Sequence, residues 1–101
     1  MFDGCKNLDS VIIPCNVKKI GSWAFRGCEK LEQIVIPEGV EVIEYRAFEK
    51  CRSLTDIEIP ASVTEIGSDV FEDCDNLTIH APAGSFAERY ARLNSVPFVA
   101  L

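Results

Sequence analysis

Hydrophobic residues recur along this chain with a period of 23 residues, the spacing from Phe25 to Phe48. The aligned columns are Phe2, Phe25, Phe48 and Phe71; Cys5, Cys28, Cys51 and Cys74; Leu8, Leu31, Leu54 and Leu77; Ile13, Ile36 and Ile59, each followed by proline; Val17, Val40 and Val63; and Ile20, Ile43 and Ile66. One unit of this length cannot bury its own apolar face, so stacked units must share a core. The pattern predicts a solenoid with one coil per repeat.

Each unit contains a short strand followed by a second ordered segment. In residues 31–37, Ile34 and Ile36 are two positions apart and so share one face of a strand, which Pro37 ends. Val40 and Ile43 then lie three apart, a spacing that suits an extended or single-turn segment. The last unit differs, because Ile79 follows Ile57 after 22 residues, and this shift marks the terminal coil.

A different pattern begins after Pro82. Ser85 and Glu88 have the spacing of a capping box, which predicts a helix that begins at Ser85 and stops near Asn94. We expect its apolar face to cover the last coil and a short extended segment to follow it; the face consists of Phe86, Ala87, Tyr90, Ala91 and Leu93. The chain then divides into repeats over 1–84 and a helix-plus-strand cap of the same domain over 85–101.

The repeat resembles the leucine-rich repeats of the bacterial surface-protein type, also called BspA-like or Treponema-type. The pattern is Cys28-x-x-Leu31-x-x-Ile34-x-Ile36-Pro37-x-x-Val40-x-x-Ile43-x-x-x-Ala47-Phe48, with a glycine after Ile20 and Ile66. The resemblance implies an α/β solenoid, a right-handed coil with short parallel strands and about 3.5 repeats. It also implies a secreted or cell-surface protein that binds other proteins, the alternative being cytoplasmic. The second unit departs from the pattern at residues 44–46, which leaves the turn there in doubt.

Charge is distributed unevenly along the chain. Residues 53–88 contain eight acidic residues and no lysine or arginine, within a net charge of −6, so we expect no nucleic-acid partner. No apolar run approaches the roughly 20 residues that span a bilayer, so membrane insertion is not expected. The first residues also lack the basic and apolar regions of a secretory signal.

The residues suited to chemistry do not form a recognisable catalytic or metal set. We expect the four cysteines of the ladder to be buried thiols, whereas Cys15, in a turn, is a candidate exposed thiol. His80 is the single histidine and lies near no recognisable nucleophile motif. Asp69, Glu72, Asp73 and Asp75 fit no known calcium loop and are interpreted as a solvated rim. We therefore expect no enzymatic activity, metal or cofactor.

Function should then lie on the variable outward positions of the strands. These candidate protein-binding residues are Ser10, Ile12, Gln33, Val35, Asp56 and Glu58. By analogy with leucine-rich repeats they point out of the concave sheet face, which begins apolar and becomes acidic along the solenoid. The alternative is a structural spacer within a longer array, with no ligand of its own. Exposed Ile12 and Val35 also have a simpler interpretation as ordinary strand residues.

The N-terminal edge of the solenoid is predicted to associate with another chain. Met1 aligns with Ala24 and Ala47, so the first coil lacks the half-unit that would precede it, and its strand near 8–13 is unpaired. Either the chain is cut from a longer array, or it forms a two-fold homodimer through this edge.

Overall fold

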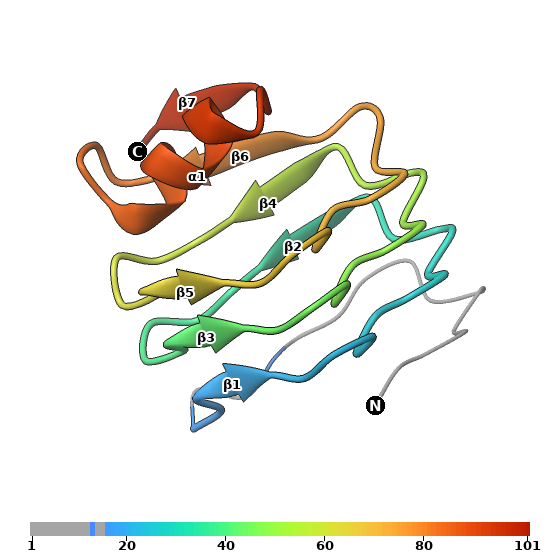
Figure 1. Cartoon of the computed structure of the whole chain (residues 1–101), viewed down its shortest axis with the longest axis horizontal. Helices are drawn as coiled ribbons and strands as arrows, with labels where there is room; N and C mark the ends of the chain where they lie inside the picture. The colour runs from blue at the N-terminus through green and yellow to red at the C-terminus, as the bar shows by residue number, and fades with distance from the viewer. Residues whose placement is uncertain (1–12, 14–15) are drawn as a thin grey trace.

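The computed structural model describes residues 13 and 16–101, and these form a stack of parallel coils (Figure 1). The elements are β1 (Lys19–Ile20), β2 (Gln33–Val35), β3 (Val42–Ile43), β4 (Asp56–Glu58), β5 (Glu65–Ile66), β6 (Thr78–Ala81), α1 (Phe86–Leu93) and β7 (Phe98–Ala100). Strands β1, β3 and β5 form one parallel sheet, and β2, β4, β6 and β7 form another. The predicted solenoid is confirmed. Its second ordered segment is a short strand, and its helix lies in the C-terminal cap.

The 23-residue period is the register between β1, β3 and β5 in one sheet and between β2 and β4 in the other. Lys19 pairs with Val42, and Gln33 pairs with Asp56. Turns complete each coil and are also joined from coil to coil, since the Phe25 N–H donates to the Ala47 carbonyl oxygen at 2.7 Å. Successive coils of the described residues are therefore joined by hydrogen bonds in the sheets and in the turns.

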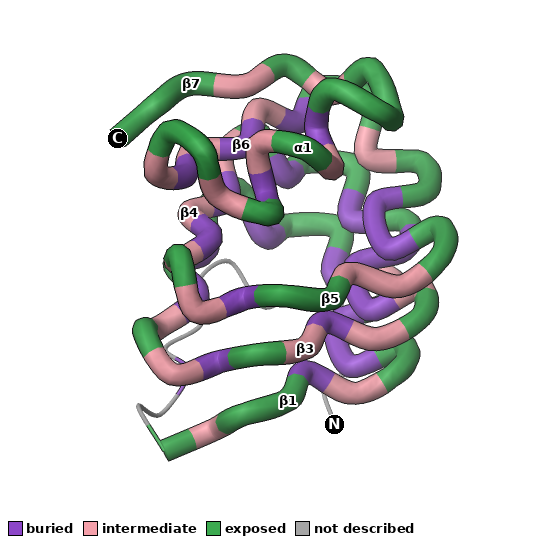
Figure 2. Tube along the Cα trace, turned by 60° about the vertical axis from the view of Figure 1, so that its left-hand side comes forward, coloured by how far each residue is buried: buried purple, intermediate pink, exposed green. Residues whose placement is uncertain are grey.

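The repeated apolar columns are the core. Buried positions recur at the same place in successive coils (Figure 2). The phenylalanine column forms a continuous stack: the ring centroids of Phe25 and Phe48 are 5.1 Å apart, and those of Phe48 and Phe71 are 5.7 Å apart. Offset stacking of this kind adds to the free energy gained from burial.

The turn of the second unit is the same as that of its neighbours, despite its different sequence. Trp23, Arg46 and Asp69 occupy equivalent positions and have φ values of 58°, 54° and 55°. This left-handed backbone is unfavourable for residues other than glycine, asparagine or aspartate, so hydrogen bonding between the coils must hold it. The doubt raised by residues 44–46 is thereby removed.

The last coil contains the expected one-residue shift. Asp56 pairs with Thr78 and Glu58 pairs with His80, a separation of 22 residues. Ile57 and Ile79 still pair with each other and are both fully buried. The shortened coil thus keeps the core column in place and sets His80 beside Glu58.

The cap begins as predicted, with one difference in its hydrogen bonds. Ser85 is the N-cap of α1 and its Oγ accepts the Glu88 N–H at 3.3 Å. In a capping box the Glu88 carboxylate would accept from the Ser85 N–H. Here it accepts from the Gly84 N–H at 2.6 Å, while the Ser85 N–H donates to the Pro82 carbonyl oxygen. The helix ends at the C-cap Asn94.

The predicted apolar face of α1 is wider than the face that the structure buries. Ala87 and Ala91 are fully buried and Tyr90 is half-buried, but Leu93 is 85% exposed and Phe86 is also exposed. The two alanines have no side chain beyond Cβ, so they allow the helix to pack closely on the last coil, and only a narrow stripe is covered. Strand β7 follows and extends the sheet beside β6.

Candidate functional site

The candidate site lies on the outward face of β2 and β4. Along these strands Ile34 and Ile57 point into the core, and their neighbours point outward, so that Gln33 and Val35 are exposed and Asp56 and Glu58 are partly exposed. Strand pairing places Gln33 beside Asp56 and Val35 beside Glu58. The predicted outward orientation is therefore observed for these four residues. Ser10 and Ile12 lie outside the described residues, as do Cys5 and Cys15.

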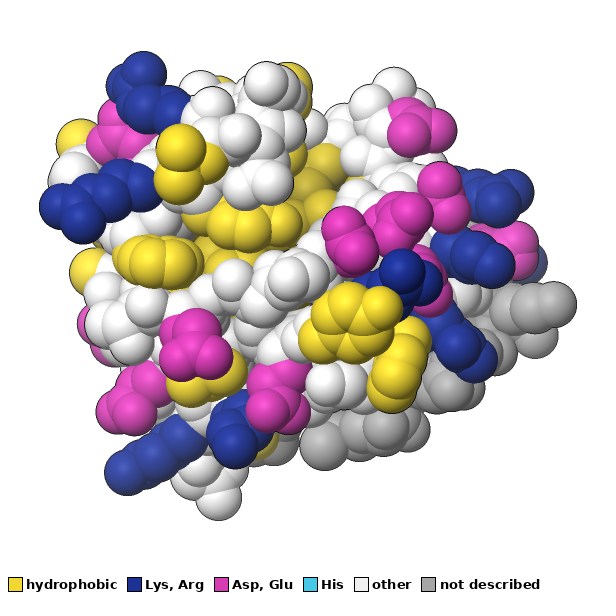
Figure 3. All heavy atoms as spheres, viewed as in Figure 1, with side chains coloured by type: hydrophobic (Ala, Val, Ile, Leu, Met, Phe, Trp, Pro, Cys, Tyr) yellow, Lys and Arg dark blue, Asp and Glu magenta, His cyan; other side chains and the backbone are white. Residues whose placement is uncertain are grey.

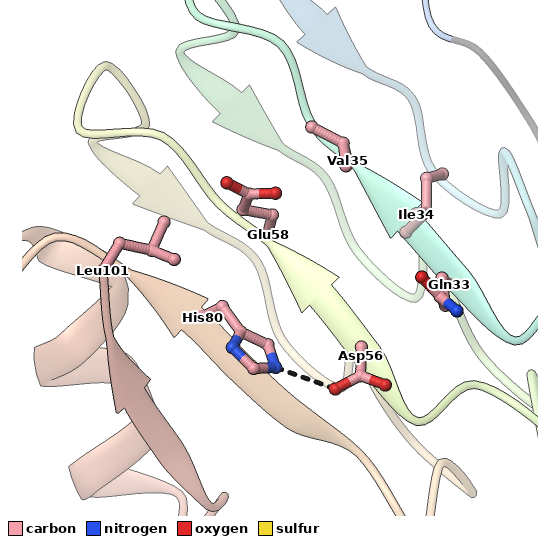
Figure 4. A pocket seen from close by; sticks show the side chains of 7 residues that line it. All are labelled: Gln33, Ile34, Val35, Asp56, Glu58, His80 and Leu101. Atoms are coloured by element: carbon pink, nitrogen blue, oxygen red, sulfur yellow. Dashed lines mark hydrogen bonds and ion pairs between the residues drawn. The ribbon is translucent and has the colours of Figure 1, made fainter.

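These four side chains line one shallow depression of about 280 Å³ (Figure 4). The other residues at this depression are Ile34, His80 and Leu101. His80 comes from β6 and Leu101 from the end of the chain, so the depression crosses the sheet from β2 to the cap. The strand face and the C-terminal cap therefore form one surface.

A hydrogen-bonded pair lies on one side of the depression. His80 Nε2 is 2.8 Å from Asp56 Oδ1, and the Thr55 hydroxyl donates to Asp56 Oδ2 at 2.9 Å. The bond to His80, followed by the bond to Thr55, lowers the pKa of the Asp56 carboxyl. Asp56 thus remains ionised and fixed in position over the physiological pH range.

Glu58 has a different environment. Within the described part of the chain, no hydrogen bond or ion pair engages its carboxylate. It lies between Val35, which is 58% exposed, and Leu101, which is also exposed. The same three residues also line a second depression of about 320 Å³, beyond the ends of the strands. The two depressions therefore adjoin at these residues, where a carboxylate is flanked by apolar side chains.

His80 and Leu101 were not among the predicted site residues. The sequence contained a signal for His80. The 22-residue step that aligns Ile57 with Ile79 also aligns Glu58 with His80. The sequence contained no such signal for Leu101, because its position depends on how α1 returns the chain to the sheet.

The cysteine ladder is structural in the part that the structure describes. Cys28 and Cys51 are fully buried, and Cys74 is partly buried. The Cys51 thiol donates to the Phe25 carbonyl oxygen at 3.0 Å, and the Cys74 thiol donates to the Phe48 carbonyl oxygen at 3.1 Å. Contact with the Cys74 thiol, together with burial, raises the pKa of the Cys51 thiol well above its ordinary value. The ladder thus satisfies carbonyl groups of the preceding coil. No group of three or more histidine, cysteine, aspartate or glutamate side chains in residues 16–101 is arranged to hold a metal.

The fold and this surface together define the class of protein. Parallel strands in a 23-residue register, buried columns of leucine, phenylalanine and cysteine, and an outward strand face with shallow depressions define a leucine-rich-repeat solenoid. The family model of the BspA-type leucine-rich repeat region matches residues 1–88 in six copies. The chain belongs to the BspA-type leucine-rich repeat family, and the resemblance seen in the sequence is confirmed.

The chain is similar to a solved leucine-rich repeat protein from Bacteroides ovatus. The two are 35% identical, with a TM-score of 0.84 over 99% of this chain. This chain spans 26% of the length of that protein. Among proteins with curated annotation, none gives a significant match. The one helix of the described residues is too short to cross a membrane.

Proposed function

We propose that this chain is a protein-binding module that uses the outward face of β2, β4 and β6. The observation that carries the proposal is the unpaired Glu58 carboxylate between exposed Val35 and Leu101, where two depressions adjoin. Shallow surfaces of this kind suit an extended polypeptide segment better than an enclosed small molecule. The partner would place apolar side chains on Val35 and Leu101 and a basic group near Glu58.

The module acts by binding and not by catalysis. His80 and Asp56 are paired, and the Thr55 hydroxyl beside them donates a hydrogen bond to the Asp56 carboxylate. The residues lining the depression include no serine, cysteine or lysine to serve as nucleophile. The face is acidic, which disfavours nucleic acid. Assays with generic ester and peptide substrates should give no turnover above the uncatalysed rate.

A peptide library displayed on phage tests the binding proposal. Peptides selected on the wild-type chain should bind at least tenfold more weakly to Val35→Asp and Glu58→Lys. Glu65→Lys is the matched control, because Glu65 is an exposed glutamate on the other sheet. Equal binding to wild type and to the three variants would show that the binding site does not lie on this face.

A second candidate function is a spacer segment in a longer repeat array, and the share of the Bacteroides ovatus protein that this chain spans favours it. If the chain is a spacer, no selected peptide should distinguish Val35→Asp or Glu58→Lys from wild type. For location, we propose the cell surface or secretion, with the cytoplasm as the alternative. Protease treatment of intact cells should remove a surface form and spare a cytoplasmic one.

A homodimer through the N-terminal edge also remains a proposal. The strand near 8–13 that would form it lies outside the described residues, apart from Ile13. Sedimentation over a wide concentration range, with and without Ile12→Lys, would detect it. A wild-type chain that stays monomeric at high concentration would count against it.

A further inference from the structure

A third depression, here called the hollow, lies on a different side of the molecule, between α1 and the turn of the last coil. It has a volume of about 270 Å³ and is lined by Asp69, Phe71 and Glu72 from the turn, and by Tyr90, Asn94 and Val96 from the cap. Figure 3 shows hydrophobic side chains forming the floor of a hollow on this face, with aspartate and glutamate side chains gathered along one margin. None of the residues that line the depressions on the strand face lines this hollow.

The floor of the hollow is aromatic. The rings of Phe71 and Tyr90 meet edge to face, with centroids 6.0 Å apart. Burial, followed by the nearby charge of Asp69, raises the pKa of the Tyr90 hydroxyl. The phenol therefore stays neutral and lies close to the Asp69 carboxylate.

The two charged groups around this floor are both hydrogen-bond acceptors. Asp69 and Glu72 contribute carboxylates that are about half exposed. The Asn94 amide nitrogen donates to the Tyr90 carbonyl oxygen at 2.9 Å, which leaves the amide oxygen as an acceptor. The residues lining the hollow include no lysine, arginine or histidine.

Arg46 only partly neutralises these carboxylates. Its guanidinium makes a short contact of 2.6 Å with Glu49, but lies 3.7 Å from Asp69 and 3.6 Å from Glu72. Three carboxylates and one guanidinium leave this cluster with two uncompensated negative charges. The interpretation of residues 69–75 as a solvated acidic rim was therefore incomplete. Asp69 and Glu72 are partly solvated, but they also form one side of the hollow.

We propose that this hollow receives a lysine side chain from a partner polypeptide. An aromatic floor suits the four-carbon stem of lysine, which packs on apolar surface while its charged end stays near water. The ammonium group supplies donors to the acceptors at the margin, and its charge complements the cluster. A site of this volume holds one side chain and not a folded segment. This site is independent of the strand face proposed above.

The test is an NMR titration of the ¹⁵N-labelled full chain with a blocked pentapeptide that has lysine between pairs of alanines. The control peptide has norleucine in place of lysine. We expect saturable shifts at the amides of residues 69–72 and 90–96 with the lysine peptide, and none at these amides with norleucine. Asp69→Asn with Glu72→Gln should weaken binding at these amides at least tenfold. The control Glu41→Gln, at an exposed glutamate that lines none of the depressions, should change it less than twofold.

The variants are chosen so that they keep the fold. Asp69 has a left-handed backbone, which asparagine also tolerates, and glutamine has the same shape as glutamate. Tyr90→Leu provides a second test through the floor and should also weaken binding. Equal shifts with the norleucine peptide, or an equal loss in Glu41→Gln, would overturn the proposal, because binding would then be apolar or governed by overall charge. Loss of sheet-face binding alone would leave this result unchanged, so the two proposals fail separately.

Discussion

Replacing Gly67 with alanine should destabilise the solenoid, although the same change at Gly21 should not. Both glycines follow the isoleucine of their repeat and occupy the same column. A Cβ on Gly67 would lie 2.7 Å from the Tyr45 backbone nitrogen and 3.1 Å from the carbonyl carbon of Glu44. Among the described residues, a Cβ on Gly21 meets only Oε1 of Glu44, at 3.9 Å.

The size of the destabilisation depends on whether the atoms that the new Cβ meets can move away. The atoms that a Gly67 side chain meets are backbone, and Gly67 is itself tied to that coil by its N–H bond to the Ile43 carbonyl oxygen at 2.8 Å. To remove this overlap, the two coils must separate by several tenths of an ångström. Overpacking of this kind costs about 1–3 kcal/mol of stability. Gly21→Ala should lie within about 0.5 kcal/mol of wild type, because an unstrained alanine mainly restricts the unfolded chain.

Chemical denaturation followed by far-ultraviolet circular dichroism measures both changes. Each kcal/mol should also lower the melting temperature by about 4–8 °C in a domain of this size. A Gly67→Ala protein within about 0.5 kcal/mol of wild type would refute the close approach of the two coils. Equal destabilisation by both substitutions would also count against it, because a Cβ on Gly21 meets no backbone atom among the described residues.

Three further predictions concern the core, the polar pair and the thiols. Phe48→Ala should cost about 3–5 kcal/mol in denaturation experiments, because it leaves a cavity and breaks two ring stacks, whereas exposed Phe86→Ala should cost much less. The lowered pKa of Asp56 stabilises the fold above the ordinary carboxyl pKa of about 4, and that contribution is lost as the pH falls through the lowered value. His80→Ala should therefore raise the pKa of Asp56 in an NMR titration, and an unchanged pKa would exclude the bond. Cys51 should resist iodoacetamide at neutral pH in the native chain and react on unfolding, as peptide mapping would show; rapid native labelling would contradict its burial.

The sequence alone determined the repeat and therefore most of the fold. A fixed 23-residue period stacks each residue on its equivalent in the next coil, so knowing the column of Phe48 or Leu54 is enough to know that it is buried. Strand alternation then gave the outward orientation of Val35 and Glu58 without any knowledge of the tertiary structure. Local hydrogen-bond chemistry likewise predicted where α1 begins.

Only the tertiary structure decided how the cap meets the repeats. The periodicity of α1 predicted an apolar face that included Leu93, but close packing of Ala87 and Ala91 on the last coil left Leu93 in solvent. The angle of that packing also brings Tyr90 to Phe71 and the end of the chain to the strand face. Contacts within the array repeat at a fixed sequence separation and can be read from its period. Contacts with the cap follow no period, and they depend on side-chain shapes that meet only when the chain is folded.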